Sequence, residues 1–537
     1  MFLTKSHPPG PDPLLNFEVS IISKVYSMSR QLMPVTLITA LMAMGLWSCD
    51  SAVTKPLNGE PYAYEPNWES LSKHQAAADW FSDAKFGIYF HWGLYSVPAY
   101  ETEWYPYFLY RDEKPDFAEY HERKFGPLEE FGYHDFIPMF RAEKFDPEDW
   151  ANLFQQAGAR FAGPVAQHHD GFAMWDSDVN PWNVADMGPE RDITGELLAS
   201  LKKKGLRTIA TFHHARLRQR HEGDRKKWAT YNSHFAYHPD YPTSTNDAEL
   251  RKFYGNMPEE EFDQYWLDQV REVVDKYSPD ILWYDVWMNF VSEKKILEMS
   301  AHFLNHAQTT GQEVVLVTKH NDLPKTMSVL DIEQGGKKDL SESVWMTDIT
   351  LSDKGSWCYT EGQKYKTPGL VLRNMIDVWS KNGVVLLNVS PMADGTINQE
   401  QQDVLGQIGQ WLDTYGEAVY GTVPFYTYGF GPARAADGAH GGQSAKVEYG
   451  VSDIRFTTSK DQKSLYVFLL GKPEAGEEIN LKKLNSIGYG PATAVKRVVE
   501  LGSGTEVAWV QEEKQYKIIA PDVEYSDLAN VFRMELE

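Results

Sequence analysis

The 537-residue chain has little cysteine and few positive charges. Cys49 and Cys358 are its two cysteines, so a network of disulfides cannot hold the fold together. Lysine and arginine number 52 against 76 aspartates and glutamates, which gives a formal net charge of −24. Phosphate backbones repel a protein of this charge. We therefore expect no nucleic-acid partner.

Several motifs that identify common enzyme classes are missing. No G-x-G-x-x-G or phosphate-binding loop follows an apolar run, and no H-E-x-x-H, zinc-spaced Cys/His cluster or G-x-S-x-G elbow occurs. The adjacent pairs His168-His169 and His213-His214 are poor chelates, because neighbours on a strand point to opposite faces. The sequence thus predicts no bound metal and no cofactor.

One uncharged stretch, residues 32–48, lies near the N-terminus and follows Arg30. It is too short for comfortable membrane spanning and has the pattern of an export signal. Its ending, Leu46-Trp47-Ser48-Cys49, resembles a bacterial lipoprotein signal in which Cys49 is lipidated. We expect residues 1–49 to be this signal, with Met28 as a candidate start, and residues 50–66 to be a tether. The protein is then a periplasmic or outer-membrane lipoprotein, touching the membrane only through its lipid; an ordinary secretory signal is the alternative.

Apolar runs alternate with segments of helical period over residues 67–423. The expected strands are Phe86–His91, Phe161–His168, Arg207–His213, Ile281–Asp285, Val314–Lys319, Val329–Glu333 and Val384–Val389. The expected helices are Pro147–Ala157, Thr194–Lys204, a helix that begins at Pro258, Glu293–Ala307, Gly369–Ser380 and Gln399–Tyr415. This alternation implies parallel βαβ units and predicts an α/β fold with a (β/α)₈-like (TIM-type) catalytic barrel. A doubly wound open sheet is the alternative.

The pattern changes over residues 424–537. Residues 454–456 and 465–469 are short β-type runs on either side of a polar turn, and Gly502-Ser503-Gly504 marks a second hairpin. These features predict a C-terminal antiparallel β-sandwich. We interpret it as a structural cap on the barrel rather than a carbohydrate-binding module.

Chemistry in a barrel gathers at the C-terminal ends of its strands. The side chains expected there are imidazoles and carboxylates: His91, His168, His169, His213, Asp285 and Glu333. Each alone is commonly structural, as a helix cap or a satisfied core group. Together, two carboxylates, hydrogen-bonding imidazoles and nearby tryptophans suit glycoside hydrolysis.

Longer motifs give a family resemblance. They are Phe86-Gly87-Ile88-Tyr89-Phe90-His91-Trp92-Gly93-Leu94-Tyr95-Ser96-Val97-Pro98-Ala99, Glu103-Trp104-Tyr105, His168-His169-Asp170-Gly171-Phe172, Asp280-Ile281-Leu282-Trp283-Tyr284-Asp285 and Leu386-Leu387-Asn388-Val389-Ser390-Pro391. Their content and order closely resemble the α-L-fucosidases of glycoside hydrolase family 29. The similarity runs from about residue 68 to the C-terminus.

The resemblance implies a role for each matching residue. Asp285 is the expected nucleophile, and Glu333 the expected general acid/base, with Glu103 as the fallback. The resemblance further implies sugar contacts at His91, Glu103, Trp104, His168, His169, Trp283 and Trp357. Cys358 stands where the family usually has glycine, and Lys319-His320 where some members have arginine. The roles of Cys358, Lys319 and His213 stay open.

These expectations define an exo-acting, retaining α-L-fucosidase that acts on fucosylated oligosaccharides or glycoconjugates. Its two carboxyl groups should lie about 5–5.5 Å apart. The alternatives are a glycosidase of the same fold acting on a related sugar such as an α-L-galactoside, and a non-catalytic fucose-binding protein. Neither the linkage preference nor the oligomeric state follows from the sequence.

Overall fold

The computed structural model describes residues 63–219, 233–320, 322–436, 446–482, 484, 494–512 and 515–537. The expected signal with Met28 and Cys49, and most of the expected tether, lie outside the described residues. Within the described part of the chain, no helix has the length and apolar character needed to cross a membrane.

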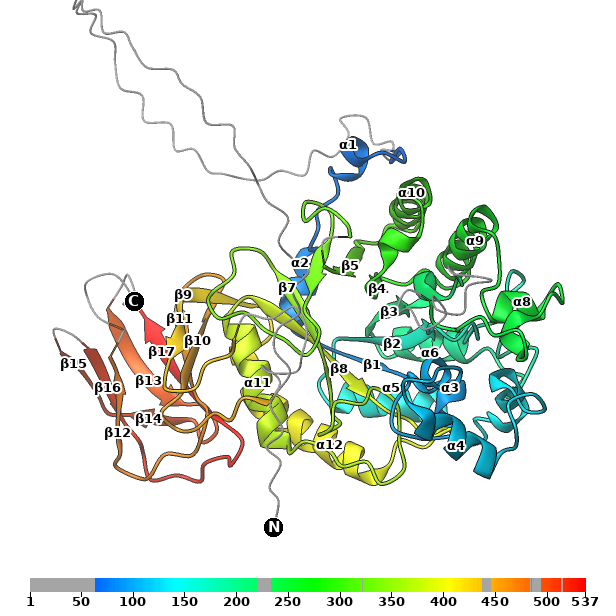
Figure 1. Cartoon of the computed structure of the whole chain (residues 1–537). Helices are drawn as coiled ribbons and strands as arrows, with labels where there is room; N and C mark the ends of the chain where they lie inside the picture. Colours follow the sequence, from blue (N-terminus) through cyan, green and yellow to red (C-terminus); the bar gives the residue numbers. More distant parts are fainter. Residues whose placement is uncertain are drawn as a thin grey trace, which may run out of the picture. The chain divides into compact units, whose positions relative to one another are not determined.

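Eight strands form a closed parallel barrel, in which each strand pairs with the next and β8 pairs with β1 (Figure 1). The strands are β1 (Phe86–Phe90), β2 (Phe161–Gln167), β3 (Arg207–Phe212), β4 (Ile281–Tyr284), β5 (Val315–Lys319), β6 (Val329–Asp331), β7 (Trp345–Thr350) and β8 (Gly383–Val389). The predicted (β/α)₈ barrel is therefore confirmed, and the open-sheet alternative is wrong.

Seven of these strands match the apolar runs of the sequence, whereas β7 was not predicted. The last four residues of β7 are Thr347-Asp348-Ile349-Thr350, and the three polar residues among them interrupt the apolar pattern. Inside the barrel they are nevertheless buried, because polar groups of neighbouring segments satisfy them. Thr347, for example, donates from Oγ1 to the carbonyl oxygens of Ile332 and Gly335.

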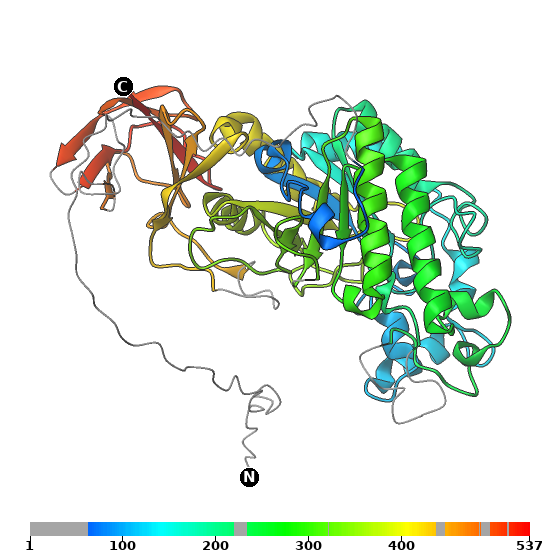
Figure 2. The same cartoon turned by 90° about the horizontal axis from the view of Figure 1, so that it is seen from above.

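Helices cover the outside of the barrel, and the two longest, α9 and α10, run side by side (Figure 2). The helices of this part of the chain are α1 (Trp68–Leu71), α2 (Asp79–Ala84), α3 (Tyr105–Leu109), α4 (Pro115–Lys124), α5 (Pro147–Gln156), α6 (Ile193–Lys203), α8 (Leu250–Phe253), α9 (Glu259–Tyr277), α10 (Glu293–Thr310), α11 (Pro368–Ser380) and α12 (Gln399–Tyr415). Helix α9 begins after Pro258 with three glutamates in its first turn, where the helix dipole favours negative charge.

The C-terminal part forms two antiparallel sheets. The larger sheet has the order β14-β13-β17-β11-β10-β9, and the smaller has the order β12-β16-β15. The strands are β9 (Thr422–Phe430), β10 (Ile454–Ser459), β11 (Ser464–Leu469), β12 (Glu478–Leu481), β13 (Val495–Glu500), β14 (Thr505–Val507), β15 (Trp509–Glu512), β16 (Gln515–Ile519) and β17 (Asn530–Leu536). Both predicted hairpins, β10–β11 and β13–β14, are present.

Hydrogen bonds join this β-sandwich to the last helices of the barrel. Arg455 on β10 is fully buried and donates to Asp377 on α11 over 2.6 Å. Arg373 on α11 donates to the carbonyl oxygen of Leu528, and Trp411 on α12 to that of Ala529. A buried charge pair of this kind is costly to break, so α11 and the sandwich are held together.

Candidate active site

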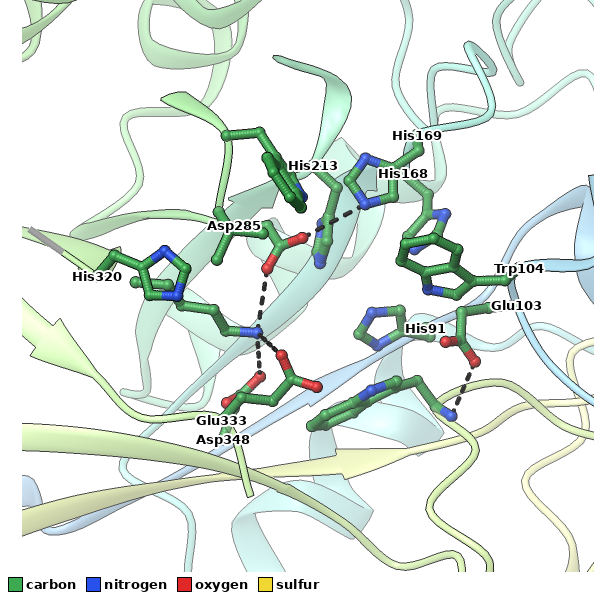
Figure 3. A pocket seen from close by; sticks show the side chains of 14 residues that line it. His91, Glu103, Trp104, His168, His169, His213, Asp285, His320, Glu333 and Asp348 are labelled. Atoms are coloured by element: carbon green, nitrogen blue, oxygen red, sulfur yellow. Dashed lines mark hydrogen bonds and ion pairs between the residues drawn. The ribbon is translucent and has the colours of Figure 1, made fainter. Parts of the chain in front are cut away.

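A cavity of about 550 Å³ opens at the C-terminal ends of the barrel strands (Figure 3). Its lining consists of His91, Glu103, Trp104, His168, His169, His213, Asp285, Val286, Trp287, Lys319, His320, Glu333, Asp348 and Trp357. Nearly every residue that the resemblance assigned to the site lies in this one cavity. The lining also includes Lys319 and His213, whose roles were open, and Asp348, which no motif had indicated.

The alternation of side chains along each strand explains why these residues converge. On β4, Ile281 and Trp283 belong to the cluster that fills the barrel, so the next residue of that series, Asp285, points toward the same axis. On β5, Val315 and Val317 fill the barrel and Lys319 ends the series. Thus, on both strands, the last side chain that points inward is a charged group at the cavity.

The same rule places His91, His213 and Asp348. Tyr89, Ile209 and Met346 point into the barrel. His91 and Asp348 follow Tyr89 and Met346 by two residues, and His213 follows Ile209 by four. Because side chains alternate along a strand, these three residues point to the same side as the barrel-filling ones. All three are at least nine-tenths buried.

Lys319 links the carboxylates of the site. Its Nζ lies 3.1 Å from Asp285 Oδ1, 2.8 Å from Glu333 Oε2 and 3.3 Å from Asp348 Oδ2 (Figure 3). The lysine is buried, and its ammonium also lies 4.9 Å from the centre of the Trp283 ring. The Lys319 ammonium therefore forms an ion pair with both carboxylates that the resemblance named as catalytic.

The electrostatics keep Asp285 ionised. Burial raises the pKa of this carboxyl, but the Lys319 ammonium and a hydrogen bond from His169 outweigh it and hold the pKa well below the usual value. His169 Nε2 lies 3.4 Å from Asp285 Oδ2. An ionised carboxylate with fixed partners is what a nucleophile requires.

Two further carboxyls lie beneath Lys319. Burial and their mutual repulsion raise the pKa of Asp331 well above the usual value, and burial also raises the pKa of Asp348. Tyr89 donates to Asp348 and Trp283 donates to Asp331, over 2.9 and 3.0 Å. The Lys319 ammonium therefore lies among four carboxyl groups, those of Asp285, Asp348, Glu333 and Asp331, which together raise its pKa.

Four of the five imidazoles that line the cavity have a pKa below the usual value. Burial lowers the pKa of His91 to about 4, and it also lowers the pKa values of His168, His169 and His213. Neutral imidazoles offer both a donor and an acceptor, so they can hydrogen-bond the hydroxyl groups of a sugar.

Loops after β1 and β7 form one wall of the cavity. Glu103 is buried and accepts a hydrogen bond of 3.0 Å from the backbone N–H of Trp357. Burial raises the pKa of Glu103. The ring of Trp104 packs under the guanidinium of Arg216, 4.5 Å from the ring centre. Glu103 thus ties the two loops together beside the cavity.

Trp283 and Cys358 lie behind the lining. The Trp283 ring is fully buried, with its centre 5.0 Å from that of His213, so it supports the cavity from below. Cys358 is a buried free thiol whose pKa is raised by burial, which makes it a poor nucleophile.

Comparison with known proteins identifies the family. The family model described as alpha-L-fucosidase matches residues 52–417. The chain belongs to the α-L-fucosidase family. Tissue alpha-L-fucosidase of Rattus norvegicus is 29% identical over 84% of this chain and 87% of its own length. Tissue alpha-L-fucosidase of Homo sapiens is 30% identical over 68% of this chain and 73% of its own.

Solved structures agree with this assignment. The alpha-fucosidase of Thermotoga maritima in complex with fucose is 28% identical, with a TM-score of 0.69, over 88% of this chain and all of that one. The predicted resemblance is therefore confirmed, and the enzyme is a glycoside hydrolase of the α-L-fucosidase family. Its barrel and C-terminal sheets match the architecture of these relatives.

Sequence reasoning gave no role to Lys319, His213 or Asp348, although the sequence held a signal for two of them. Lys319 and His213 each end an apolar run in the inward series of their strand. Asp348 carried no such signal, because its own strand was not predicted. Val286, Trp287 and His320, which follow β4 and β5, were also missed.

Proposed function

We propose that this enzyme is an exo-acting, retaining α-L-fucosidase that releases terminal α-L-fucosyl residues from glycans through a covalent intermediate. The observation that carries the proposal is the bridging position of Lys319 between Asp285 and Glu333. It places two carboxyl groups on one cavity, as glycosidic bond cleavage requires.

The bridge limits the separation of the two carboxyl groups. Because Lys319 Nζ lies 3.1 Å from one oxygen of Asp285 and 2.8 Å from one of Glu333, those oxygens are at most about 5.9 Å apart. Retaining glycosidases hold these groups about 5–5.5 Å apart, whereas inverting enzymes leave about 6.5–9.5 Å for a water. This upper limit on the distance between the two carboxylate oxygens favours a retaining mechanism.

The mechanism has two steps. Asp285 attacks the anomeric carbon while Glu333 donates a proton to the departing glycosidic oxygen, which gives a fucosyl ester and a free aglycone. Glu333, now a carboxylate, then removes a proton from water, whose oxygen attacks the anomeric carbon and releases Asp285. Lys319 faces an ionised carboxylate throughout, Asp285 before the first step and Glu333 after it.

The shape and polarity of the cavity support a terminal sugar as the substrate. Trp283 and other side chains fill the barrel behind the cavity, so a glycan reaches the cavity from its open side, which suits a terminal residue. The neutral imidazoles of His91, His168 and His169 suit uncharged hydroxyl groups. The Thermotoga maritima relative was solved in complex with fucose, which supports fucose as that residue.

Proton NMR of a single reaction tests substrate and stereochemistry together. The enzyme should hydrolyse an aryl α-L-fucoside, and α-L-fucose should appear before mutarotation produces the β anomer. Initial release of β-L-fucose would contradict the retaining mechanism. Hydrolysis of the aryl α-L-galactoside but not of the α-L-fucoside would show that the sugar is misassigned.

We propose in addition that the protein is exported and anchored through a lipid on Cys49, on the basis of its signal sequence alone. Cys49→Ser removes the acceptor, so the full chain expressed in a Gram-negative host should move from the membrane fraction to the soluble fraction. Cys358→Ser is the matched control and should stay with the membranes, because Cys358 is buried in the barrel loops. Retention of Cys49→Ser in the membrane fraction would contradict the anchor.

A further inference from the structure

Three imidazoles at the base of the cavity have the arrangement of a metal site. His91, His168 and His213 follow three consecutive strands, β1, β2 and β3, and one ring nitrogen from each lies within 4.8 Å of the other two. Their side chains cluster in Figure 3, with ring centres 4.9 to 5.5 Å apart. Each residue is more than nine-tenths buried.

The hydrogen bonds around His91 fix the tautomer that a metal ligand needs. Asn388 donates from Nδ2 to the carbonyl oxygen of Trp357 over 2.7 Å, so its Oδ1 faces His91. His91 Nδ1 therefore donates to Asn388 Oδ1 over 2.8 Å, and Nε2 keeps its lone pair. A ligating histidine commonly donates its other N–H to a carbonyl in this way.

The other two rings are available as well. The Nδ1 atoms of His168 and His213 are buried and have no hydrogen-bond partner among the residues that the structure describes. Lys319, the lysine of the cavity, does not exclude a cation, because the ionised Asp285 balances its charge.

We propose that His91, His168 and His213 bind one divalent cation of borderline softness, such as Zn²⁺, in the sugar-free enzyme, and that the ion and fucose exclude each other. Three imidazoles favour zinc, cobalt, nickel or copper over magnesium or calcium. Zn–N bonds of about 2.0–2.1 Å require the rings to close around the ion by a small side-chain movement. The exclusion of fucose rests on the proposed function; the ion takes part in no step of the reaction.

Calorimetric titration of the full chain with ZnCl₂ tests the site directly. We expect one saturable site, whose affinity falls at least tenfold in His213→Asn and which saturating L-fucose abolishes. Zinc should also inhibit fucoside hydrolysis competitively, with an inhibition constant equal to its dissociation constant, and a chelator should reverse the inhibition.

A surface site provides the matched control. His302 and His306 on α10 both approach Asp275, at 2.8 and 3.4 Å, and are half-buried. The His302→Ala, His306→Ala double variant should keep the fucose-sensitive zinc site unchanged. Loss of zinc binding in this variant but not in His213→Asn would overturn the proposal, as would absence of saturable binding.

A structural readout separates this proposal from the proposed function. An anomalous difference map at the zinc edge, from crystals of the wild-type protein, should show a peak among the three rings whether or not aryl fucosides are hydrolysed. Because the map uses the wild-type protein, it tests the metal site even if His213→Asn fails to fold. A peak elsewhere, with none among the rings, would refute the site. Zinc binding that persists at the rings in saturating fucose would refute the exclusion alone.

Discussion

Asp285→Ala should lower kcat for an aryl α-L-fucoside by about 10⁴-fold or more, because a methyl group cannot form the covalent intermediate. The effect should fall on kcat rather than on KM, since the imidazoles and tryptophans that we expect to hold the sugar are unchanged. Azide fits the space left by the carboxylate and should restore part of the activity, giving a fucosyl azide of inverted anomeric configuration. Steady-state kinetics and NMR of the product measure both effects.

The matched control, Asp280, lies at the other end of the same strand, β4. Asp280 precedes β4 at the opposite end of the barrel, where it pairs with Arg207 and accepts hydrogen bonds from Thr208. Asp280→Ala should lower the melting temperature but change kcat little, because residues at this end of a barrel serve stability. Activity in Asp285→Ala close to that of the wild type would remove Asp285 from the mechanism.

Lys319→Met should lower kcat by about 10²–10³-fold, the usual cost of removing one preorganised electrostatic partner. Without the ammonium, burial raises the pKa of Asp285, which must be ionised to attack. The acidic limb of kcat/KM should therefore move to higher pH. A pH–rate profile of the variant beside that of the wild type measures the shift.

Lys319→Arg distinguishes charge from mere packing. Arginine keeps the positive charge between Asp285 and Glu333, so it should restore most of the activity and return the acidic limb to its wild-type position. If Lys319 only packed against the Trp283 ring, Lys319→Met would lower the stability and leave the pH profile unmoved. That outcome would contradict an electrostatic role for the lysine.

The sequence predicted the barrel well because its strands are buried on both faces. Runs such as Ile281–Tyr284 and Gly383–Val389 are apolar almost throughout, and helices begin with recognisable caps, such as Asp146 before Pro147. Strand β7 was not predicted, because its polar residues hide the apolar pattern. A barrel can bury such residues when groups on neighbouring segments form hydrogen bonds with them. Only the closed structure supplies the partners of Thr347 and Asp348.

The sequence predicted which residues belong to the candidate site better than it predicted how they are arranged in space. The motifs identified Asp285, Glu333 and the histidines, and the structure brings them to one cavity. The motifs could not show that a single ammonium contacts both carboxylates, because Lys319 ends β5 whereas Glu333 follows β6. Nor could adjacent histidine pairs reveal the cluster of His91, His168 and His213. Its members follow three different strands, so only the folded barrel brings them together.

Trapping with 2-deoxy-2-fluorofucosyl fluoride tests the central claim most directly. The fluorine slows both steps, and the fluoride leaving group lets the first proceed, so the ester accumulates. Mass spectrometry of the digested enzyme should then show one 2-fluorofucosyl group on the peptide that contains Asp285. A label on Glu333, or an unlabelled enzyme that hydrolyses the aryl fucoside, would contradict covalent catalysis by Asp285.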